Sequence, residues 1–186
     1  MSKDSFCAGN HSIDRGYVHV YTGNAKGKTT AAFGLAFRAM GHGLKTYIGQ
    51  FIKKHPYGEL QAAIMVPDYI TIEQYGRGQF LHVKKRSEIE DIEAAMRGLS
   101  RITEVMLSGD YNIVVADEIL MAQHYKLVSQ CDILALIARR PDGVEMILTG
   151  RYATKEIIAS ADLVTEMKEV KHYYKNGVPV RMGIEY

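Results

Sequence analysis

The chain has 186 residues, of which 47% are hydrophobic and 24% are charged, and its formal net charge is +2. These values are ordinary for a globular protein, and the net charge is too small to favour a nucleic-acid partner. The chain contains no run of about eighteen apolar residues and no signal-peptide core, so we expect a cytoplasmic protein that does not bind a membrane.

The first fifteen residues are polar and show no hydrophobic period. We therefore expect residues 1–15 to form a mobile N-terminal arm and residues 16–186 to form a single α/β domain. Cys7 and Cys131 lie far apart and lack CxxC spacing, which predicts neither a zinc site nor a disulfide framework.

The most informative motif follows the first expected strand, which begins at Tyr17, and reads Thr22-Gly-Asn-Ala-Lys-Gly-Lys-Thr29. It is close to the phosphate loop, in which Gly, four residues and Gly-Lys-Ser/Thr precede a helix, although Thr22 takes the place of the first glycine. The backbone N–H groups of such a loop bind phosphate, Lys28 reaches phosphate oxygens, and the Thr29 hydroxyl completes a Mg²⁺ shell. The alternative is a plain glycine turn, which would not need the Lys-Thr pair.

Strands and helices are expected to alternate along the rest of the chain. A helix rich in small residues should run over residues 28–40 and lie close on the sheet. Further strands are expected at residues 45–52, 69–75, 112–118, 144–149 and 162–167, with helices at 59–65, 89–109, 119–125, 129–139 and 154–161 and an extended tail at 178–186. This order predicts a three-layer α/β fold of the P-loop NTPase-like (RecA-like) type, with a mostly parallel sheet of about six strands.

The helix at residues 89–109 has the clearest period in the sequence. Its apolar positions recur at three- and four-residue steps and are Ile89, Ile92, Met96, Leu99, Ile102, Val105 and Met106. Its other faces carry charges that we expect to be solvated, namely Glu88, Glu90, Asp91, Glu93 and Arg97.

Three loops after strands carry candidate site residues. Phe80 and Leu81 lie between glycines and His82, where they either face a ligand or cover the end of the sheet. Asp117 and Glu118 end a fully apolar strand, so Asp117 is a candidate Mg²⁺ ligand opposite Thr29, although two acids also suit the start of a helix. Arg151 follows the fifth strand, where it either binds a phosphate or is simply exposed.

Several of these strings together resemble the ATP:corrinoid adenosyltransferases, also called cob(I)alamin adenosyltransferases, over nearly the whole chain. The resemblance lies in residues 22–34, in Arg38-Ala-Met-Gly-His-Gly43, in Gln50-Phe-Ile-Lys53, in Asp117-Glu118, in Leu148-Thr-Gly-Arg151 and in the ending from Val170-Lys-His172 to Met182-Gly-Ile-Glu-Tyr186. It implies transfer of the 5′-deoxyadenosyl group of ATP to the Co(I) centre of a corrinoid, which leaves inorganic triphosphate.

The resemblance also implies roles for individual residues. Mg²⁺ would lie between Thr29 and Asp117 or Glu118, and Lys28 and Glu118 are the candidate catalytic residues. The residues implied to bind ATP are Gly23, Asn24, Ala25, Lys26, Gly27, Lys28, Thr29, Thr30, Arg38 and Arg151, and those implied to face the corrin are Phe80 and Leu81.

The partners that the resemblance implies are an electron-donating reductase and a second copy of the chain, whose N-terminal arm closes over the site. Two features depart from the family pattern. Ala25 replaces a usual loop glycine, which requires that residue 25 avoid a positive φ angle, and no tryptophan accompanies Phe80.

Two other functions use the same motifs. A P-loop ATPase or small-molecule kinase would share the phosphate loop and Asp117-Glu118 but would release phosphate or phosphorylate an acceptor. A nucleotide-gated protein that delivers corrinoid would not turn over ATP.

Overall fold

Six parallel strands form one sheet in the computed structural model, which describes residues 12–55, 57–77 and 89–185. The strands lie in the order β3-β2-β4-β5-β1-β6. Their bounds are β1 Val18–Thr22, β2 Thr46–Phe51, β3 Ile70–Tyr75, β4 Ile113–Asp117, β5 Glu145–Thr149 and β6 Leu163–Glu166. The predicted six-stranded parallel sheet is thus confirmed.

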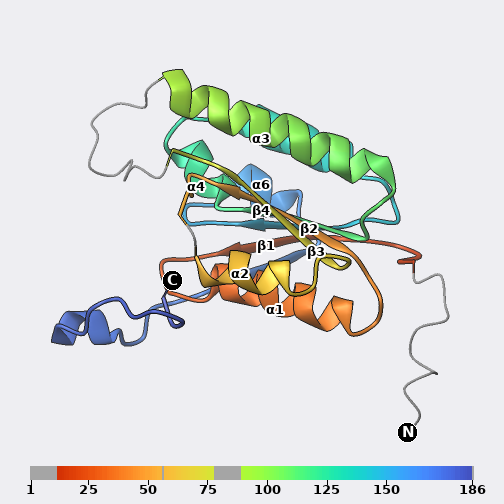
Figure 1. Cartoon of the computed structure of the whole chain (residues 1–186). Coiled ribbons are helices and arrows are strands. Elements are labelled where there is room, and N and C mark those ends of the chain that lie inside the picture. Colours follow the sequence, from red (N-terminus) through yellow and green to blue (C-terminus); the bar gives the residue numbers. More distant parts are fainter. Residues whose placement is uncertain (1–11, 56, 78–88, 186) are drawn as a thin grey trace, which may run out of the picture.

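Helices cover both faces of this sheet (Figure 1). On one face lie α1 (Lys28–Met40) and α2 (Gly58–Ile64), and on the other lie α3 (Ile89–Ser108), α4 (Ile119–His124), α5 (Gln130–Ala138) and α6 (Lys155–Ala159). A short 3₁₀ helix, Tyr173–Asn176, lies in the C-terminal segment. The three-layer arrangement is therefore as the sequence predicts.

The hydrophobic core lies on both sides of the central strands. Every residue of β2 and β4 is buried, as expected for strands covered by helices on two faces. The small side chains Ala32, Ala36 and Ala39 bring α1 close to the sheet, as its composition predicts.

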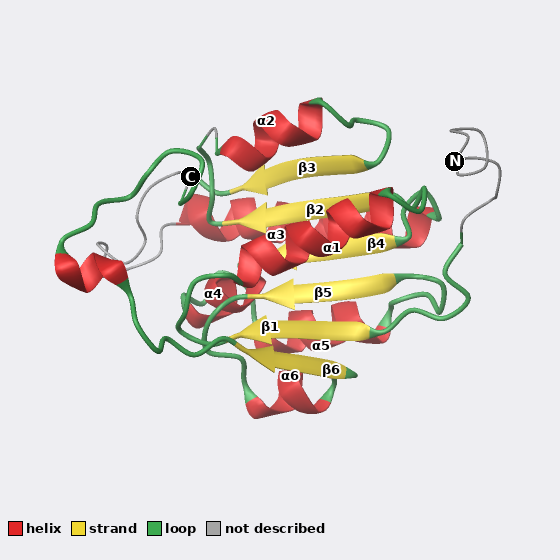
Figure 2. Cartoon of the chain, turned by 90° about the horizontal axis from the view of Figure 1, so that it is seen from below, coloured by secondary structure: helices red, strands yellow, loops and turns green. Residues whose placement is uncertain are grey.

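All the strands end at the same edge of the sheet (Figure 2). Strand β5 lies between β1 and β4, and β2 flanks β4 on its other side. Because these strands are parallel, the loops after β1, β2, β4 and β5 gather at this carboxyl edge, where open α/β sheets bind ligands.

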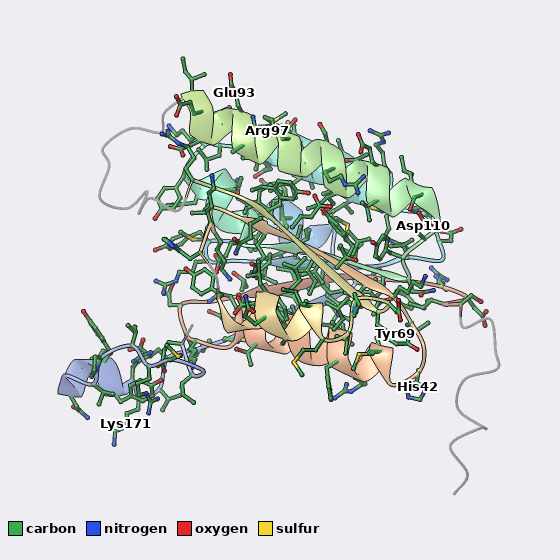
Figure 3. The ribbon with its side chains drawn as sticks, viewed as in Figure 1. His42, Tyr69, Glu93, Arg97, Asp110 and Lys171 are labelled. Atoms are coloured by element: carbon green, nitrogen blue, oxygen red, sulfur yellow. The ribbon has the colours of Figure 1, made fainter. Side chains whose placement is uncertain are left out.

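In the N-terminal half of α3, the buried residues differ from those that the hydrophobic period predicts. Ile89 is 75% exposed and Met96 39% exposed, whereas Asp91, which we expected in solvent, is only 6% exposed. Apart from Asp91, the buried residues here are the small ones Ala94, Ala95 and Gly98, and the ring of Tyr75 packs directly against Gly98. Figure 3 shows Glu93 and Arg97 on the outer side of α3, as predicted.

The C-terminal tail also differs from its predicted extended form, because residues 182–185 form a turn. Across the described ranges, no helix is long and apolar enough to cross a lipid bilayer.

Candidate functional site

The phosphate loop connects β1 to α1 at the carboxyl edge of the sheet. Gly23 and Gly27 have φ angles of 98° and 121°, which a residue with a side chain rarely adopts. A Cβ at Gly23 would also lie 2.3 Å from the Met167 carbonyl oxygen. Ala25 is absent from the residues with positive φ, so the condition for replacing glycine at this position is met.

Lys28 is buried at the start of α1 and turns back into the loop. Its ammonium donates hydrogen bonds of 2.7 Å to the carbonyl oxygens of both Gly23 and Ala25. Burial lowers the pKa of Lys28, and the positive charge of Arg151 adds to this effect. A buried cation at the centre of the loop, which donates to two backbone carbonyl oxygens, is suited to receive a phosphate.

Asp117 is the fully buried acid of the site, at the end of β4. Its Oδ1 atom accepts hydrogen bonds from the hydroxyls of Thr29, at 2.9 Å, and of Thr149, at 2.7 Å. The carboxylate therefore bonds across the sheet edge to the phosphate loop. It does not cap α4, whose first turn contains no acidic residue.

Two more side chains contact the same carboxylate, Gln50 from β2 and Lys53 from the loop after it. Lys53 Nζ lies 2.9 Å from Asp117 Oδ2, and Gln50 Nε2 lies 3.2 Å from it. Glu59 of α2 completes the group, with Oε1 3.8 Å from Lys53 Nζ and 3.2 Å from Gln50 Nε2.

Lys53, Gln50 and Thr149 are site residues that were not predicted from the sequence. The available signal was their position, because all three lie at or just after the carboxyl end of a strand.

The groups around Asp117 offset the effect of burial on its pKa. Burial alone would raise the pKa of Asp117, but Lys53 and the hydroxyls of Thr149 and Thr29 outweigh burial and hold the pKa below its usual range. Burial acts to lower the pKa of Lys53, yet Asp117 keeps that pKa raised. The pKa of Glu118 is raised by burial and then by the neighbouring Asp117.

Three residues that follow strands have strained backbone conformations. Ile52, Glu118 and Tyr152 come after β2, β4 and β5 and have φ angles of 68°, 62° and 62°. Positive φ is costly for residues with side chains and is concentrated at functional sites. The strain here lies along the edge that carries the phosphate loop.

The other predicted site residues are dispersed. Asn24, Lys26 and Thr30 are exposed on the loop and the first turn of α1. Arg151 is exposed after β5, near enough to act on the pKa of Lys28. Arg38 lies in the last turn of α1, roughly 15 Å along the helix from Lys28 at 1.5 Å per residue. Phe80 and Leu81 lie outside the described residues.

The donors at this edge suit Mg²⁺. The carboxylate of Asp117 and the hydroxyl of Thr29 are hard oxygen ligands. In the described part of the chain, no group of three or more His, Cys, Asp or Glu residues could hold a metal. Mg²⁺ commonly takes only one or two carboxylates together with substrate phosphates and water, so this donor set fits an ion that arrives with a nucleotide.

Comparison with known proteins matches this chain to one family over almost its whole length. Residues 14–186 match the family described as ATP:corrinoid adenosyltransferase BtuR/CobO/CobP. The chain is 34% identical over 174 residues to a corrinoid adenosyltransferase of Pseudomonas aeruginosa, which covers 93% of this chain and 85% of that protein. It is 35% identical to one of Escherichia coli and 34% identical to the corrinoid adenosyltransferase CobA of Salmonella typhimurium, with 93% and 87% of the two chains covered in each case.

A solved structure supports the fold assignment. The crystal structure of a KaiC-like protein from Pyrococcus horikoshii superposes with a TM-score of 0.55 at 16% identity, covering 86% of this chain and 76% of that one. At this identity the likeness concerns the fold alone. It confirms the predicted P-loop NTPase-like architecture.

Proposed function

This chain belongs to the ATP:corrinoid adenosyltransferase family and is an ATP-dependent transferase that acts on a corrinoid, and we propose that the phosphate loop with Asp117 forms its ATP site. The reaction joins the 5′ carbon of ATP to cobalt. The electron pair of Co(I) forms the Co–C bond while the bond from C5′ to the triphosphate oxygen breaks, and triphosphate leaves with that electron pair.

The observation that carries the proposal is the link between the loop and Asp117. Thr29 follows Lys28 in the first turn of α1, and its hydroxyl donates directly to Asp117 at 2.9 Å. The loop cation Lys28 and the buried acid Asp117 therefore lie close enough for Asp117 to act on the pKa of Lys28. A plain glycine turn would require neither feature.

The residues at this edge favour departure of a triphosphate. Lys28 and Arg151 supply positive charge next to the loop, and the N–H groups at the start of α1 face the same region. Co(I) is already a strong nucleophile, so the chemistry needs no general base. Catalysis then consists of positioning C5′ and stabilising the leaving group.

Mg²⁺ is proposed to bind with ATP at Thr29 and Asp117. When bound, the ion supplies charge neutralisation for the triphosphate. Glu118 is the candidate additional ligand, because it follows Asp117 in sequence and its carboxyl lies close enough for Asp117 to raise its pKa. A role for Glu118 as a water-activating base is not required.

The corrinoid side of the site is proposed from the sequence and the family. Phe80 and Leu81 would crowd the lower face of the corrin and displace its lower axial ligand, which eases reduction to Co(I). A separate reductase would supply the electron, and in a homodimer the N-terminal arm of the partner would cover the site.

Product analysis tests the proposed function. Purified protein is mixed with Mg²⁺, ATP and a chemically reduced corrinoid, and phosphorus products and corrinoid spectra are measured together. We expect adenosylcorrinoid and triphosphate in equal amounts. Release of phosphate or ADP without a Co–C bond would instead identify a hydrolase or a kinase.

A further inference from the structure

The C-terminal arm, which we define as residues 167–185, leaves the sheet after β6 and returns to its carboxyl edge. Figures 1 and 2 show the arm projecting away from the three layers, and Figure 3 shows Lys171 on this projecting part. Val170 is 97% exposed and Tyr174 is 70% exposed. The two ends of the arm, in contrast, both contact the phosphate loop.

The first contact is made by the backbone of Met167. Its N–H donates to the Thr22 carbonyl oxygen at 2.8 Å, and its carbonyl oxygen accepts from the Ala25 N–H at 3.1 Å. The absence of a side chain at Gly23 allows this approach. Because the Ala25 N–H is already bonded to the arm, it is not one of the groups that this loop presents to a phosphate.

The second contact joins Lys26 to the end of the arm. Lys26 Nζ donates to the carbonyl oxygen of Ile184 at 2.7 Å and lies 3.3 Å from Glu185 Oε1. The Lys26 side chain therefore points to the arm, although the sequence predicted a phosphate contact for it. The two ends of the arm thus bond to neighbouring residues of the loop, Met167 to Ala25 and residues 184–185 to Lys26.

Glu185 is itself fixed by the arm. Its carboxylate accepts hydrogen bonds from the Tyr173 hydroxyl, from the Arg181 N–H at 2.8 Å and from the Arg181 guanidinium at 3.3 and 3.4 Å. The side chain is only 14% exposed. An isolated surface ion pair contributes little, but here the carboxylate is already ordered, so binding Lys26 requires little further loss of side-chain freedom.

We propose that Glu185 is a positioning residue for ATP, which holds the phosphate loop through Lys26 in the conformation that receives the triphosphate. A loop that is ordered before binding loses less conformational entropy when the ligand arrives. The inference rests on the proposed function only in taking ATP as the ligand of the loop. By linkage, ATP should in turn stabilise the docked arm.

The direction in which Glu185→Gln changes ATP affinity distinguishes a positioning role from a simple charge effect. Glu185→Gln removes a negative charge close to the loop, so electrostatics alone predicts tighter binding of anionic ATP. Positioning predicts weaker binding, because an amide holds the Lys26 ammonium less strongly than a carboxylate does. The variant is isosteric, and Glu185 lies on the arm outside the hydrophobic core, so folding should be unaffected.

The experiment measures the dissociation constant of Mg·ATP by calorimetry without corrinoid. We expect Glu185→Gln to weaken ATP binding roughly tenfold. In the double variant with Lys26→Met, the loss of binding free energy should be smaller than the sum of the two single losses. In steady-state assays the KM for ATP should rise while the KM for Co(I) corrinoid stays constant. The matched control is Lys175→Ala, which removes another ion pair of the arm, that with Glu169, and should leave both values unchanged.

Limited proteolysis gives a second readout. Trypsin should cut the arm of the wild-type chain more slowly when ATP is present, and Glu185→Gln should lose this protection. Unchanged or tighter ATP binding in Glu185→Gln would overturn the inference, as would equal changes in both KM values. A wild-type chain that bound no ATP would instead overturn the proposed function.

Discussion

The carboxylate of Asp117 determines the electrostatics of the site because it is completely buried. A buried charge is tolerated only when it is paired and hydrogen-bonded, and here four side chains donate to its two oxygens. Lys53 is the one cation among these four donors. We therefore infer that Lys53 neutralises Asp117 until a metal ion arrives with the nucleotide.

Replacement of Lys53 tests this role. Lys53→Met keeps most of the side-chain volume but leaves the buried carboxylate without a cation, which should cost about 3 kcal/mol of stability. For a chain of this size, the melting temperature should fall by roughly 6–12 °C. Mg²⁺ without nucleotide should restore part of the loss, because the metal replaces the missing charge.

Lys54→Met is the matched control for this measurement. Lys54 is the exposed neighbour of Lys53, and its replacement should change stability by no more than about 0.5 kcal/mol. If Lys53→Met melted at the wild-type temperature, or if Mg²⁺ stabilised both variants equally, Lys53 would not be the counter-ion of Asp117.

Lys28 is expected to act on the leaving group. Its two loop acceptors are backbone carbonyl oxygens, which it can exchange for phosphate oxygens when ATP binds. Lys28→Ala should therefore reduce the rate of adenosyl transfer by about 10²- to 10³-fold. Single-turnover kinetics with excess Co(I) corrinoid measures this rate, and near-normal turnover would contradict the role of Lys28 and of the phosphate loop.

The two acids after β4 should differ in their effects. Asp117→Asn removes the charge that binds both Lys53 and the proposed metal, so the Mg²⁺ concentration needed for half-maximal activity should rise about tenfold or more. Glu118→Gln should raise it less, since the Thr29 hydroxyl bonds to Asp117 and the pKa of Glu118 is raised by burial. A Mg²⁺ titration of each variant provides the comparison, and an unchanged requirement in both would exclude a metal at these residues.

Local sequence patterns predict most of the elements that carry the site. The limits of α1 are as predicted, and β4 ends at Asp117, because the phosphate loop and an apolar strand both have strong local signals. Lys53 was missed because its role depends on β2 lying beside β4, and strand order is not encoded in any local pattern. The contact between Lys26 and Glu185 spans nearly the whole chain and could not be predicted for the same reason.

In helix α3, by contrast, a strong local pattern gives a wrong prediction. The hydrophobic period is clear, yet in the first half of the helix it identifies the wrong residues as buried. The helix lies so close to the sheet that small residues are buried there and larger apolar ones turn outward. Periodicity detects which side chains are apolar, whereas the distance between layers depends on partners such as the ring of Tyr75.

Gly98 therefore offers a test of the close packing between α3 and β3. A Cβ at this position would lie 2.6 Å from a ring atom of Tyr75, so Gly98→Ala should destabilise the protein by about 1–3 kcal/mol. Gly34→Ala on α1 is the control, because a Cβ there has no neighbour within 4 Å and alanine should stabilise the helix by about 1 kcal/mol. Urea unfolding should show opposite shifts of the midpoint, and equal shifts would contradict this packing.

The loops after β1, β2, β4 and β5 lie at one edge of the sheet, and their residues supply the triphosphate half of the proposed reaction. The corrin half must lie where C5′ can reach it, and the loop that follows β3 begins at this same edge. Residues 78–88 of that loop lie outside the described residues, so the role of Phe80 and Leu81 stays a prediction.

The two residues are predicted to act on the cobalt before it is reduced. If Phe80 and Leu81 displace the lower axial ligand, then Phe80→Ala and Leu81→Ala should lose activity when Co(II) corrinoid is supplied with a reductant. They should lose much less with Co(I) corrinoid, because that nucleophile is already four-coordinate and only the positioning of ATP is still required. Optical spectra of bound Co(II) corrinoid should show the lower ligand retained in the double variant. Equal losses with both substrates would indicate simple packing, and a wild-type spectrum in the double variant would exclude the proposed role of these residues.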